Sequence, residues 1–316
     1  MTSSPPSPRP ALAVVRAGGR SARELAAASR AALDRPLRRS AELTVAFVTD
    51  DALVLGAFQR AAGLQLPAGD VPLARRGSGG PEVRVGPGTL HVALALSHPG
   101  ALVACDEKRI VNRYVRPLLR ALTRAGSPAH YFGRDWISVA HRPAGWVGFA
   151  HDAATRRTFF EAFVAVRTSF AWTDRPSFMG RAPATLEALA GRPLDLDVLL
   201  RTVVEAYGRD VVPDDLPWVD GPADGELPAD PPWAATVEEA IGPIGAGVDA
   251  LGTFRVGGDL LVSRDAVAAL EARLATTADA DVAAVVDETL AAPGVALDGV
   301  RALSSVREVI LRARHG

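Results

Sequence analysis

The sequence contains little of several residue types, and each shortage excludes a class of protein. Its 316 residues include one cysteine, Cys105, which cannot build a disulfide framework. No run of about 18 apolar residues is present, so no membrane-spanning helix is predicted. The 35 basic and 36 acidic residues leave a formal net charge of −1, which favours neither nucleic acid nor an acidic membrane as a partner. The first residues, MTSSPPSPRP, lack the apolar core of a signal peptide. We therefore expect a soluble, cytoplasmic protein.

Lysine is almost missing. Of the 35 basic residues, 34 are arginine and one, Lys108, is lysine. Arginine cannot replace a lysine amine as a reacting group. Any chemistry that needs such an amine therefore has a single candidate in the chain.

The pattern of apolar residues predicts an α+β protein. Hydrophobic residues make up 48% of the chain, enough for a sizeable core, and the length suits two domains. The closely spaced, hairpin-like strands favour a mixed, mainly antiparallel sheet with packed helices. Pro117 is expected to kink or divide the second helix. The expected helices are 22–34, 106–125 and 194–207, and the expected strands are 43–49, 89–96, 135–141, 146–150 and 158–166.

Composition also suggests where the domains end. Residues 1–20 are interpreted as a disordered arm and 21–209 as the first domain. Residues 210–233 carry six prolines and many acidic residues, which is typical of a linker. Residues 234–316 are expected to form a small α+β accessory domain, whose last helix begins at a capping box of Ser305 and Glu308.

The most informative segment is the loop Arg75-Arg76-Gly77-Ser78-Gly79-Gly80. Consecutive glycines allow backbone amides to converge on an anion, and two arginines add charge for a carboxylate or phosphate. The loop is neither a Walker loop nor a dinucleotide-binding fingerprint. The alternative is an ordinary flexible surface loop.

Three histidines, His130, His141 and His151, fall within 22 residues, with Asp135 and Asp152 among them. They could form a polar ligand pocket or supply a general base. Their spacing matches no metal-ligand signature, so a metal-dependent hydrolase is the weakest interpretation. They could equally lie on the surface or in the core.

The order of several short motifs resembles the lipoate–protein ligase family, within the biotin and lipoate ligase and octanoyltransferase superfamily. That family has a strand end V-x-L-G-x-x-Q, the loop R-R-x-S/T-G-G-G, and then G-x-L-N, G-R-N-D and G-x-A-Q. The sequence around Gly257-Gly258-Asp259 is similar to the accessory domain of bacterial ligases. The corresponding segments here are Leu53–Gln59, Arg75–Gly80, Gly88–His91, Gly133–Asp135 and Gly148–His151.

The resemblance implies that ATP activates lipoate or another medium-chain acyl group, and it is compatible with Mg as a further cofactor. The acyl group would then pass to an amine on an acyl-carrier or lipoyl-type domain, or on a small molecule. The residues expected to bind the acyl group and the phosphate are Arg75, Arg76, Ser78, Gly79, Gly80, His91, His130, Arg134, Trp146 and Gly148, with Asp135 on the nucleotide side.

The departures from the family pattern are large. The family's lysine, in G-x-K-I-x-G-x-A, is replaced by Gly145 or Trp146, neither of which carries charge. Lys108 is distant in sequence and is not expected to reach this position. Arg142 is a nearby cation but is not equivalent to lysine. Pro81 takes the place of the loop's third glycine and removes one amide donor.

The cysteine of the transferase branches is also missing from its place. Cys105 precedes Asp106 and Glu107, whose charge disfavours a thiolate, so an ordinary small residue is the preferred interpretation over a nucleophile. His151 takes the place of the family's glutamine. Two hypotheses remain: an acyl-transferring enzyme with His151, Arg142 and Asp135 as catalytic residues, or an inactive relative that binds a ligand.

Overall fold

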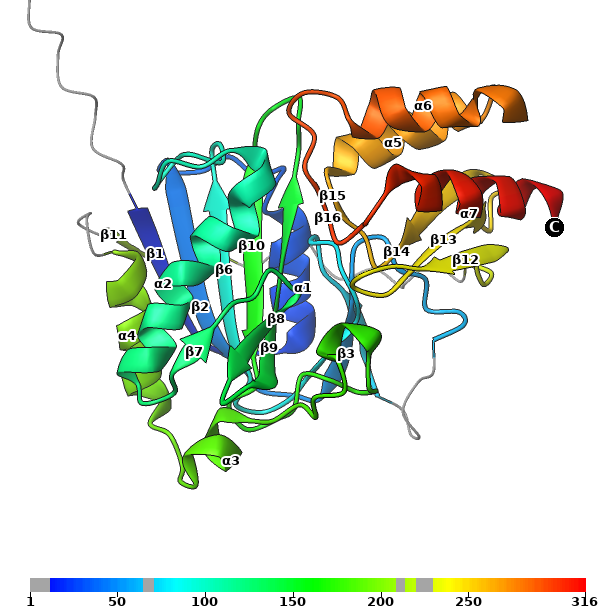
Figure 1. Ribbon diagram of the computed structural model, residues 1–316. Helices are drawn as coiled ribbons and strands as arrows, with labels where there is room; N and C mark the ends of the chain where they lie inside the picture. Colours follow the sequence, from blue (N-terminus) through cyan, green and yellow to red (C-terminus); the bar gives the residue numbers. More distant parts are fainter. Residues whose placement is uncertain (1–11, 65–70, 209–213, 220–229) are drawn as a thin grey trace, which may run out of the picture.

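The computed structural model describes residues 12–64, 71–208, 214–219 and 230–316. Its centre is an eight-stranded sheet in the order β11-β1-β2-β6-β10-β9-β8-β7 (Figure 1). β1 pairs in parallel with β2 and β11, and the remaining neighbours are antiparallel. The predicted mixed, mainly antiparallel sheet is therefore confirmed. The strands are β1 (Leu12–Arg20), β2 (Ala41–Val48), β6 (Leu90–Leu96), β7 (Ala129–His130), β8 (Trp136–Val139), β9 (Arg142–His151), β10 (Thr158–Val164) and β11 (Asp214–Leu216).

Helices cover both faces of this sheet. On one face lie α2 (Ile110–Arg124) and α4 (Leu196–Tyr207), which pack on the side chains of Val14, Leu43 and Val45. The α2 helix runs through Pro117 undivided, because its buried apolar side holds it against the sheet. On the other face lies α1 (Ala22–Ala31). A small sheet packs beside α1, in the order β4 (Leu73–Arg75), β3 (Ala52–Leu55) and β5 (Val83–Val85).

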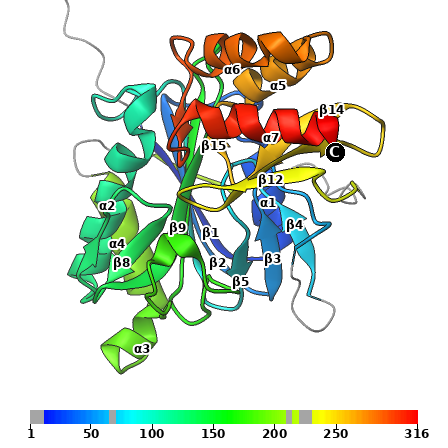
Figure 2. The same ribbon diagram turned by 45° about the vertical axis from the view of Figure 1, so that its right-hand side comes forward.

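The C-terminal domain has its own core. Three strands, β12 (Ala235–Glu238), β13 (Pro243–Val248) and β14 (Phe254–Gly258), pack against three helices. Figure 2 shows this domain against one end of the central sheet. A short ladder of β15 (Leu261–Val262) and β16 (Leu297–Asp298) lies next to the first domain. The helices are α5 (Arg264–Leu274), α6 (Val282–Leu290) and α7 (Leu303–His315). The remaining short elements are α3 (Leu186–Ala190), η1 (Glu107–Arg109), η2 (Pro176–Phe178) and η3 (Asp279–Asp281).

Three expectations from the sequence need correction. Residues 12–20 form β1 and not a disordered arm. The arginines and glycines after Val15 interrupt the apolar pattern, so the sequence did not indicate this strand. Residues 214–216 of the expected linker form β11 at the edge of the sheet, while 1–11, 209–213 and 220–229 lie outside the described residues. The last helix begins at Leu303 with Ala302 as its N-cap, so Ser305 lies inside the first turn and forms no capping box.

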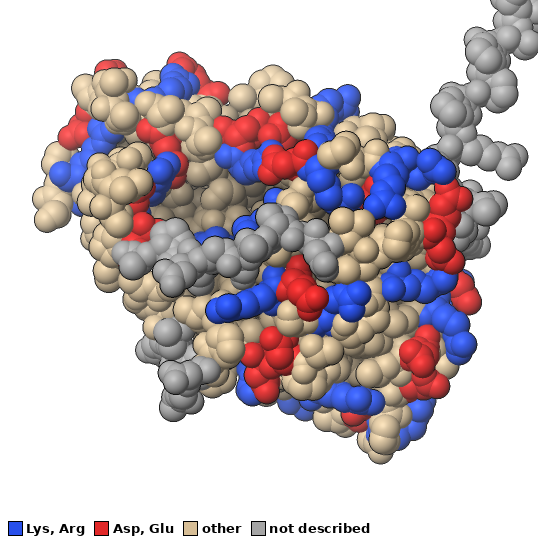
Figure 3. All heavy atoms as spheres, turned by 180° about the vertical axis from the view of Figure 1, so that it is seen from behind, with Lys and Arg blue, Asp and Glu red and all other residues tan. Residues whose placement is uncertain are grey.

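The surface agrees with the balanced composition. Figure 3 shows basic and acidic side chains interspersed over the rear face. Within the described part of the chain, no helix is both long and apolar enough to cross a membrane.

The two domains are joined by Arg60, which is 4% exposed. Its guanidinium donates to the carbonyls of Pro231, Gly247 and Val248 at 3.1, 3.2 and 2.9 Å. It also stacks on Trp233, at 3.8 Å from the ring centroid. One side chain from the first domain thus satisfies several carbonyl groups of the second.

We predict that Arg60→Ala loosens the C-terminal domain and lowers the free energy of unfolding by roughly 2 to 3 kcal/mol, because the stacking on Trp233 is lost and three carbonyls lose their donor. Urea unfolding and the rate of limited proteolysis measure the effect. The matched control is Arg84→Ala, since Arg84 is 40% exposed and lies 5.2 Å from the Trp172 ring. Equal behaviour of the two variants would contradict this role of Arg60.

Candidate functional site

The Arg75–Gly80 loop is held closed by its own second arginine. Arg76 is fully buried, and its guanidinium stacks on Trp146 at 3.9 Å from the ring centroid. Its Nε donates to Ser78 Oγ at 3.0 Å, and burial lowers its pKa to about 10. Its Nη atoms donate to the carbonyls of Val54, Gly79 and Pro81 at 2.9, 2.8 and 2.6 Å. The predicted ligand-binding arginine therefore shapes the loop in this arrangement.

The loop's amides also have protein partners. Gly79 N donates to the carbonyl of Phe149 at 3.1 Å, and Gly80 N donates to that of Leu260 at 2.7 Å. A Cβ on Gly79 would lie 2.1 Å from the Leu260 oxygen, so glycine is required for this close approach. The sequence predicted an anionic ligand at these amides. In this structure the amides of Gly79 and Gly80 donate to the chain's own carbonyls.

Arg75 is half-buried and contacts the segment after β3. Its Nη1 donates to the carbonyl of Gln59 and, at 3.3 Å, to that of Gly56. Burial lowers its pKa. The side chain therefore joins the loop to the neighbouring strand end.

Beneath the loop lies a buried carboxylate that sequence reasoning did not select. Glu161 on β10 is fully buried, and its Oε1 lies 2.8 Å from His91 Nε2 on β6. Its Oε2 accepts from Ser29 Oγ of α1 at 3.1 Å and from Ser78 Oγ of the loop. Ser29 Oγ in turn accepts from Gly77 N at 2.9 Å. The only signal for this network was an acidic residue inside the apolar strand FFEAFVAV.

The charge of Glu161 is retained despite burial. Burial pushes its pKa up, but the hydrogen bonds from His91 and Ser78 and the nearby Arg76 guanidinium outweigh it, so the pKa lies below the usual value. His91 thus belongs to this network. Its Nδ1 has no hydrogen-bond partner among the described residues.

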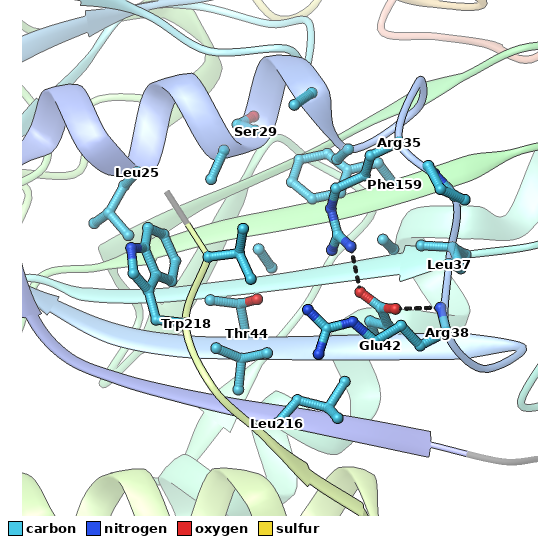
Figure 4. Close-up of a pocket in the computed structure, with 18 of the residues that line it drawn as sticks. Leu25, Ser29, Arg35, Leu37, Arg38, Glu42, Thr44, Phe159, Leu216 and Trp218 are labelled. Carbon is cyan, nitrogen blue, oxygen red and sulfur yellow. Dashed lines mark hydrogen bonds and ion pairs between the residues drawn. The ribbon is translucent and has the colours of Figure 1, made fainter. Parts of the chain in front are cut away.

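A cavity of about 480 Å³ lies between α1 and the central sheet, next to this network. Its walls are mainly apolar, and Figure 4 shows Leu25 and Ser29 from α1 opposite Thr44 and Phe159 from the sheet. Trp218 and Leu216 close one side. A cavity of this size and character is typical of small-molecule sites. Of the residues selected from the sequence as ligand-binding, His91 lies in its wall.

One end of this cavity is charged. The Glu42 side chain is 2% exposed and pairs with Arg35 Nη1 at 2.5 Å, and it also accepts from the Arg38 backbone amide at 2.5 Å (Figure 4). The side chain of Arg38 is exposed and makes no hydrogen bond or ion pair within the described residues. The cavity therefore combines an apolar body with a cation at one end.

The three residues expected to be catalytic do not meet. Arg142 and His151 occupy opposite ends of β9, which at about 3.3 Å per residue places them roughly 30 Å apart. Arg142 donates to the carbonyls of Ala182 and Pro183 at 2.9 and 2.8 Å. His151 is 1% exposed, with Nδ1 2.9 Å from Thr158 Oγ1 and Nε2 3.2 Å from the Gly294 carbonyl. Its pKa is lowered by burial.

The other histidine-segment residues are dispersed as well. His130 stacks on the exposed Phe132, with ring centroids 6.0 Å apart. Arg134 Nη2 lies 3.8 Å from Met179 Sδ. Among the described residues, no group of three or more His, Cys, Asp or Glu side chains is arranged to hold a metal ion. Cys105 has a pKa raised to about 11 by burial and by Asp106, which favours the ordinary thiol.

The resemblance puts Gly145 or Trp146 at the position of the family lysine. Trp146 is 1% exposed, and a Cβ on Gly148 would lie 2.3 Å from its ring. Gly145 faces the backbone of Phe163 and Val164 across the ladder. Neither residue leaves room for a cation at this point of β9.

Asp135 and Lys108 lie beside two smaller cavities of about 190 Å³ each. Asp135 is 2% exposed, its Oδ1 has no partner among the described residues, and burial raises its pKa to about 6 against the opposing charge of Arg175. Lys108 lines the second of these cavities with Gly133 and Phe149. The turn before α2 therefore brings Lys108 beside Gly133 and Phe149, which belong to two of the motifs that resemble the family.

Comparison with known proteins places the fold. No family model matches the chain, and no curated protein is similar enough to match. Among solved structures, P. falciparum LipL1 in complex with lipoate has a TM-score of 0.62 at 12% identity, over 94% of this chain and 98% of that one. A bipartite lipoate protein ligase from Thermoplasma acidophilum gives 0.52 at 15% identity, over 65% and 87%. Lipoate-protein ligase A bound with ATP gives 0.53 at 16%, over 65% and 89%.

The fold is therefore that of lipoate-protein ligases, which confirms the resemblance drawn from the motifs. The match over 94% of the chain includes the C-terminal domain as well as the first. At these identities the likeness concerns the fold, so the activity has to be argued from this chain's own residues.

We predict that Glu161→Gln lowers the free energy of unfolding by about 3 to 5 kcal/mol at pH 7, because a buried charge network loses its anion. The native pKa of Glu161 is depressed, so its stabilisation is present above the unfolded value of about 4.3 and is lost as the pH falls through the native value. The difference in the free energy of unfolding between wild type and variant should therefore become smaller below about pH 4, as measured by urea unfolding at a series of pH values.

The matched control is Glu187→Gln, since Glu187 pairs with Arg167 at the surface at 2.9 Å. Its replacement should change the free energy of unfolding by less than about 1 kcal/mol. If the difference in the free energy of unfolding between wild type and Glu161→Gln stays constant from pH 3 to 7, the carboxylate charge is not what stabilises the network.

Proposed function

We propose that this protein handles a medium-chain acyl group: it binds a carboxylic acid of the lipoate or octanoate type in the cavity beneath α1. With ATP as co-substrate, the carboxylate would displace pyrophosphate to form an acyl-adenylate, and an amine of a lipoyl-type carrier domain or of a small molecule would then take the acyl group and release AMP. The observation that carries the proposal is the cavity itself, about 480 Å³ with apolar walls and arginines at one end. Apolar walls suit a hydrocarbon tail, and a guanidinium suits a carboxylate.

The similar solved structures support the proposal at the level of the fold. One of them contains lipoate and another contains ATP, and a third was determined as a ligase together with its E2 lipoyl domain. For this chain, lipoate, ATP and a carrier domain are proposals that follow from the shared fold and from the cavity.

The residues around the cavity have different roles in the proposed binding. Phe159, Trp218 and Leu25 exclude water from the tail. Arg38 is the cation available to the carboxylate, because Arg35 is already paired with Glu42. The Glu161 network fixes α1 against the sheet and so keeps the cavity wall in place.

ATP does not fit the Arg75–Gly80 loop in this arrangement. The amides of Gly79 and Gly80 already donate to Phe149 and Leu260, and the Arg76 guanidinium donates to the loop's own carbonyls. A phosphate at the loop would have to displace Leu260 and the C-terminal domain that carries it. We therefore assign no step to ATP at the loop.

The second function is that of a ligand-binding relative without catalysis. The specific observation in its favour is that neither Gly145 nor the buried Trp146, the two candidates for the position of the family lysine, carries a charge. A site that keeps its cavity but lacks the cation that stabilises the reacting anion would bind without reacting. Release of pyrophosphate from ATP in the presence of octanoate separates the two: turnover well above background contradicts the non-catalytic function.

We predict that Ala28→Phe abolishes binding of octanoate and lipoate, since Ala28 lines the cavity from α1 and a phenyl ring would occupy it. Isothermal calorimetry should show at least about a tenfold loss of affinity, equivalent to about 1.4 kcal/mol. Arg23→Phe, on an exposed position of the same helix, is the matched control and should bind as the wild type does.

We predict that Arg38→Ala weakens the binding of octanoate about fivefold and leaves the binding of octanamide unchanged, because only the acid carries a charge.

If Ala28→Phe binds octanoate and lipoate as tightly as the wild type does, the cavity is not their binding site. Equal losses for octanoate and octanamide in Arg38→Ala would show that Arg38 does not bind the carboxylate.

A further inference from the structure

The wall of the cavity beneath α1 contains a buried nitrogen atom without a partner. His91 on β6 lines this cavity and is 1% exposed, and its Nδ1 makes no hydrogen bond among the described residues. Buried polar atoms of side chains in folded proteins nearly always have a hydrogen-bond partner. An unpartnered atom in the wall of a cavity is therefore a place where a ligand can supply the missing partner.

The partner that His91 lacks is a hydrogen-bond donor. Its Nε2 lies 2.8 Å from Glu161 Oε1, and an ionised carboxylate can only accept, so the single hydrogen of the neutral imidazole is on Nε2. Nδ1 is then an acceptor. Ser29 and Ser78 hold the carboxylate in place from its other oxygen, so the tautomer of His91 is set by the protein. A ligand group at Nδ1 has to bring its own hydrogen.

Thr44 offers a second hydrogen bond near the same place. Its side chain lines the cavity from β2, between the Trp218 side and the Glu42 side (Figure 4), and it makes no hydrogen bond within the part of the chain that the structure describes. Thr44 pairs with Ala93, two residues from His91 on β6, so Thr44 and His91 are diagonal neighbours about 7 to 8 Å apart. A hydroxyl group between them can donate to His91 and accept from Thr44.

His91 lies at the end of the cavity away from Arg38. Glu42, which accepts from the Arg38 amide, pairs across the ladder with Ala95, and His91 is four residues from Ala95. At about 3.3 Å per residue these two positions on β6 are roughly 13 Å apart. Ala95, Ala93 and His91 all line the cavity. This length is comparable with that of an extended octanoate molecule, whose last carbon would come to His91 when its carboxylate is at Arg38.

We propose that the acid bound in this cavity carries a hydroxyl group on the last carbon of its chain, and that His91 Nδ1 and Thr44 Oγ1 hold this hydroxyl. The inference rests on the proposed function, because it takes the carboxylate to lie at Arg38. It narrows the substrate class from medium-chain acids to ω-hydroxylated ones. His91 and Thr44 are then specificity-determining residues, at the opposite end of the chain from the carboxylate that reacts.

Calorimetry with three acids that share one carbon chain tests the inference. Octanoate, ω-hydroxyoctanoate and ω-methoxyoctanoate have the same carboxylate, and their chains end in an apolar group, in a donor that also accepts, and in an acceptor alone. We expect the wild type to bind ω-hydroxyoctanoate about fivefold more tightly than octanoate. It should bind ω-methoxyoctanoate more weakly than ω-hydroxyoctanoate, because the ether has no hydrogen to donate to Nδ1.

Two variants assign the preference to these side chains. Thr44→Val keeps the shape of the side chain, removes its hydroxyl and leaves the Glu161 network intact, so it should reduce the fivefold preference to about twofold without changing the affinity for octanoate. The matched control is Thr202→Val on α4, which covers the other face of the sheet, and it should bind all three acids as the wild type does. His91→Phe should abolish the preference. Because this change also takes a partner from Glu161, Thr44→Val carries the test if His91→Phe does not fold.

Nitrogen NMR of the histidine side chains reads the contact directly. The protein is labelled with ¹⁵N-histidine, and the Nδ1 signal of His91 is assigned by its absence in His91→Phe. We expect ω-hydroxyoctanoate to produce a saturable shift of this signal that octanoate does not produce. If His91→Phe does not fold, the same signal is assigned from its coupling network in the wild type.

Equal affinity of the wild type for octanoate and ω-hydroxyoctanoate would overturn the inference and leave the proposed function standing. Binding of ω-methoxyoctanoate as tight as that of ω-hydroxyoctanoate would overturn it as well, because Nδ1 would then not be accepting a hydrogen bond from the ligand. If none of the three acids binds, the proposed function fails, and the inference fails with it.

Discussion

The buried carboxylate of Glu161 is the interaction on which the rest of the site depends. It joins β10 to β6 through His91, to α1 through Ser29 and to the loop through Ser78. An isolated charge in such a place would be very costly, and it is tolerated because each oxygen has partners and the Arg76 guanidinium is close. One residue thus fixes a helix, a loop and two strands relative to one another.

This network divides the face of the sheet into two parts with different chemistry. On one side the loop is packed: Arg76 fills it from within, and the Leu260 carbonyl of the C-terminal domain meets its glycine amides. On the other side the cavity of about 480 Å³ lies between α1 and the sheet. The place for an apolar ligand and the segment with the strongest motif are therefore neighbours that share Ser29 but are not the same site.

Several features could be predicted from the sequence because they are local. The alternation of Leu90, Val92 and Leu94 indicated β6, and the order of the glycine motifs indicated the fold of lipoate-protein ligases. The chemistry was harder to predict because it depends on distance in space. Glu161 and Ser29 are 132 positions apart and meet only through the sheet, while Arg142 and His151 are close in sequence but lie at opposite ends of one extended strand. Lys108 reaches Gly133 only because α2 packs across the sheet, which no spacing in the sequence reveals.

The proposed function requires that the cavity beneath α1 holds the acyl chain. The most direct measurement is a crystal structure of the protein with lipoate, with the two ring sulfur atoms located by their anomalous signal. We expect both sulfur atoms among Leu25, Phe159 and Trp218, with the carboxylate toward Arg38. Sulfur atoms located at the Gly79–Gly80 loop, with Leu260 displaced, would contradict it.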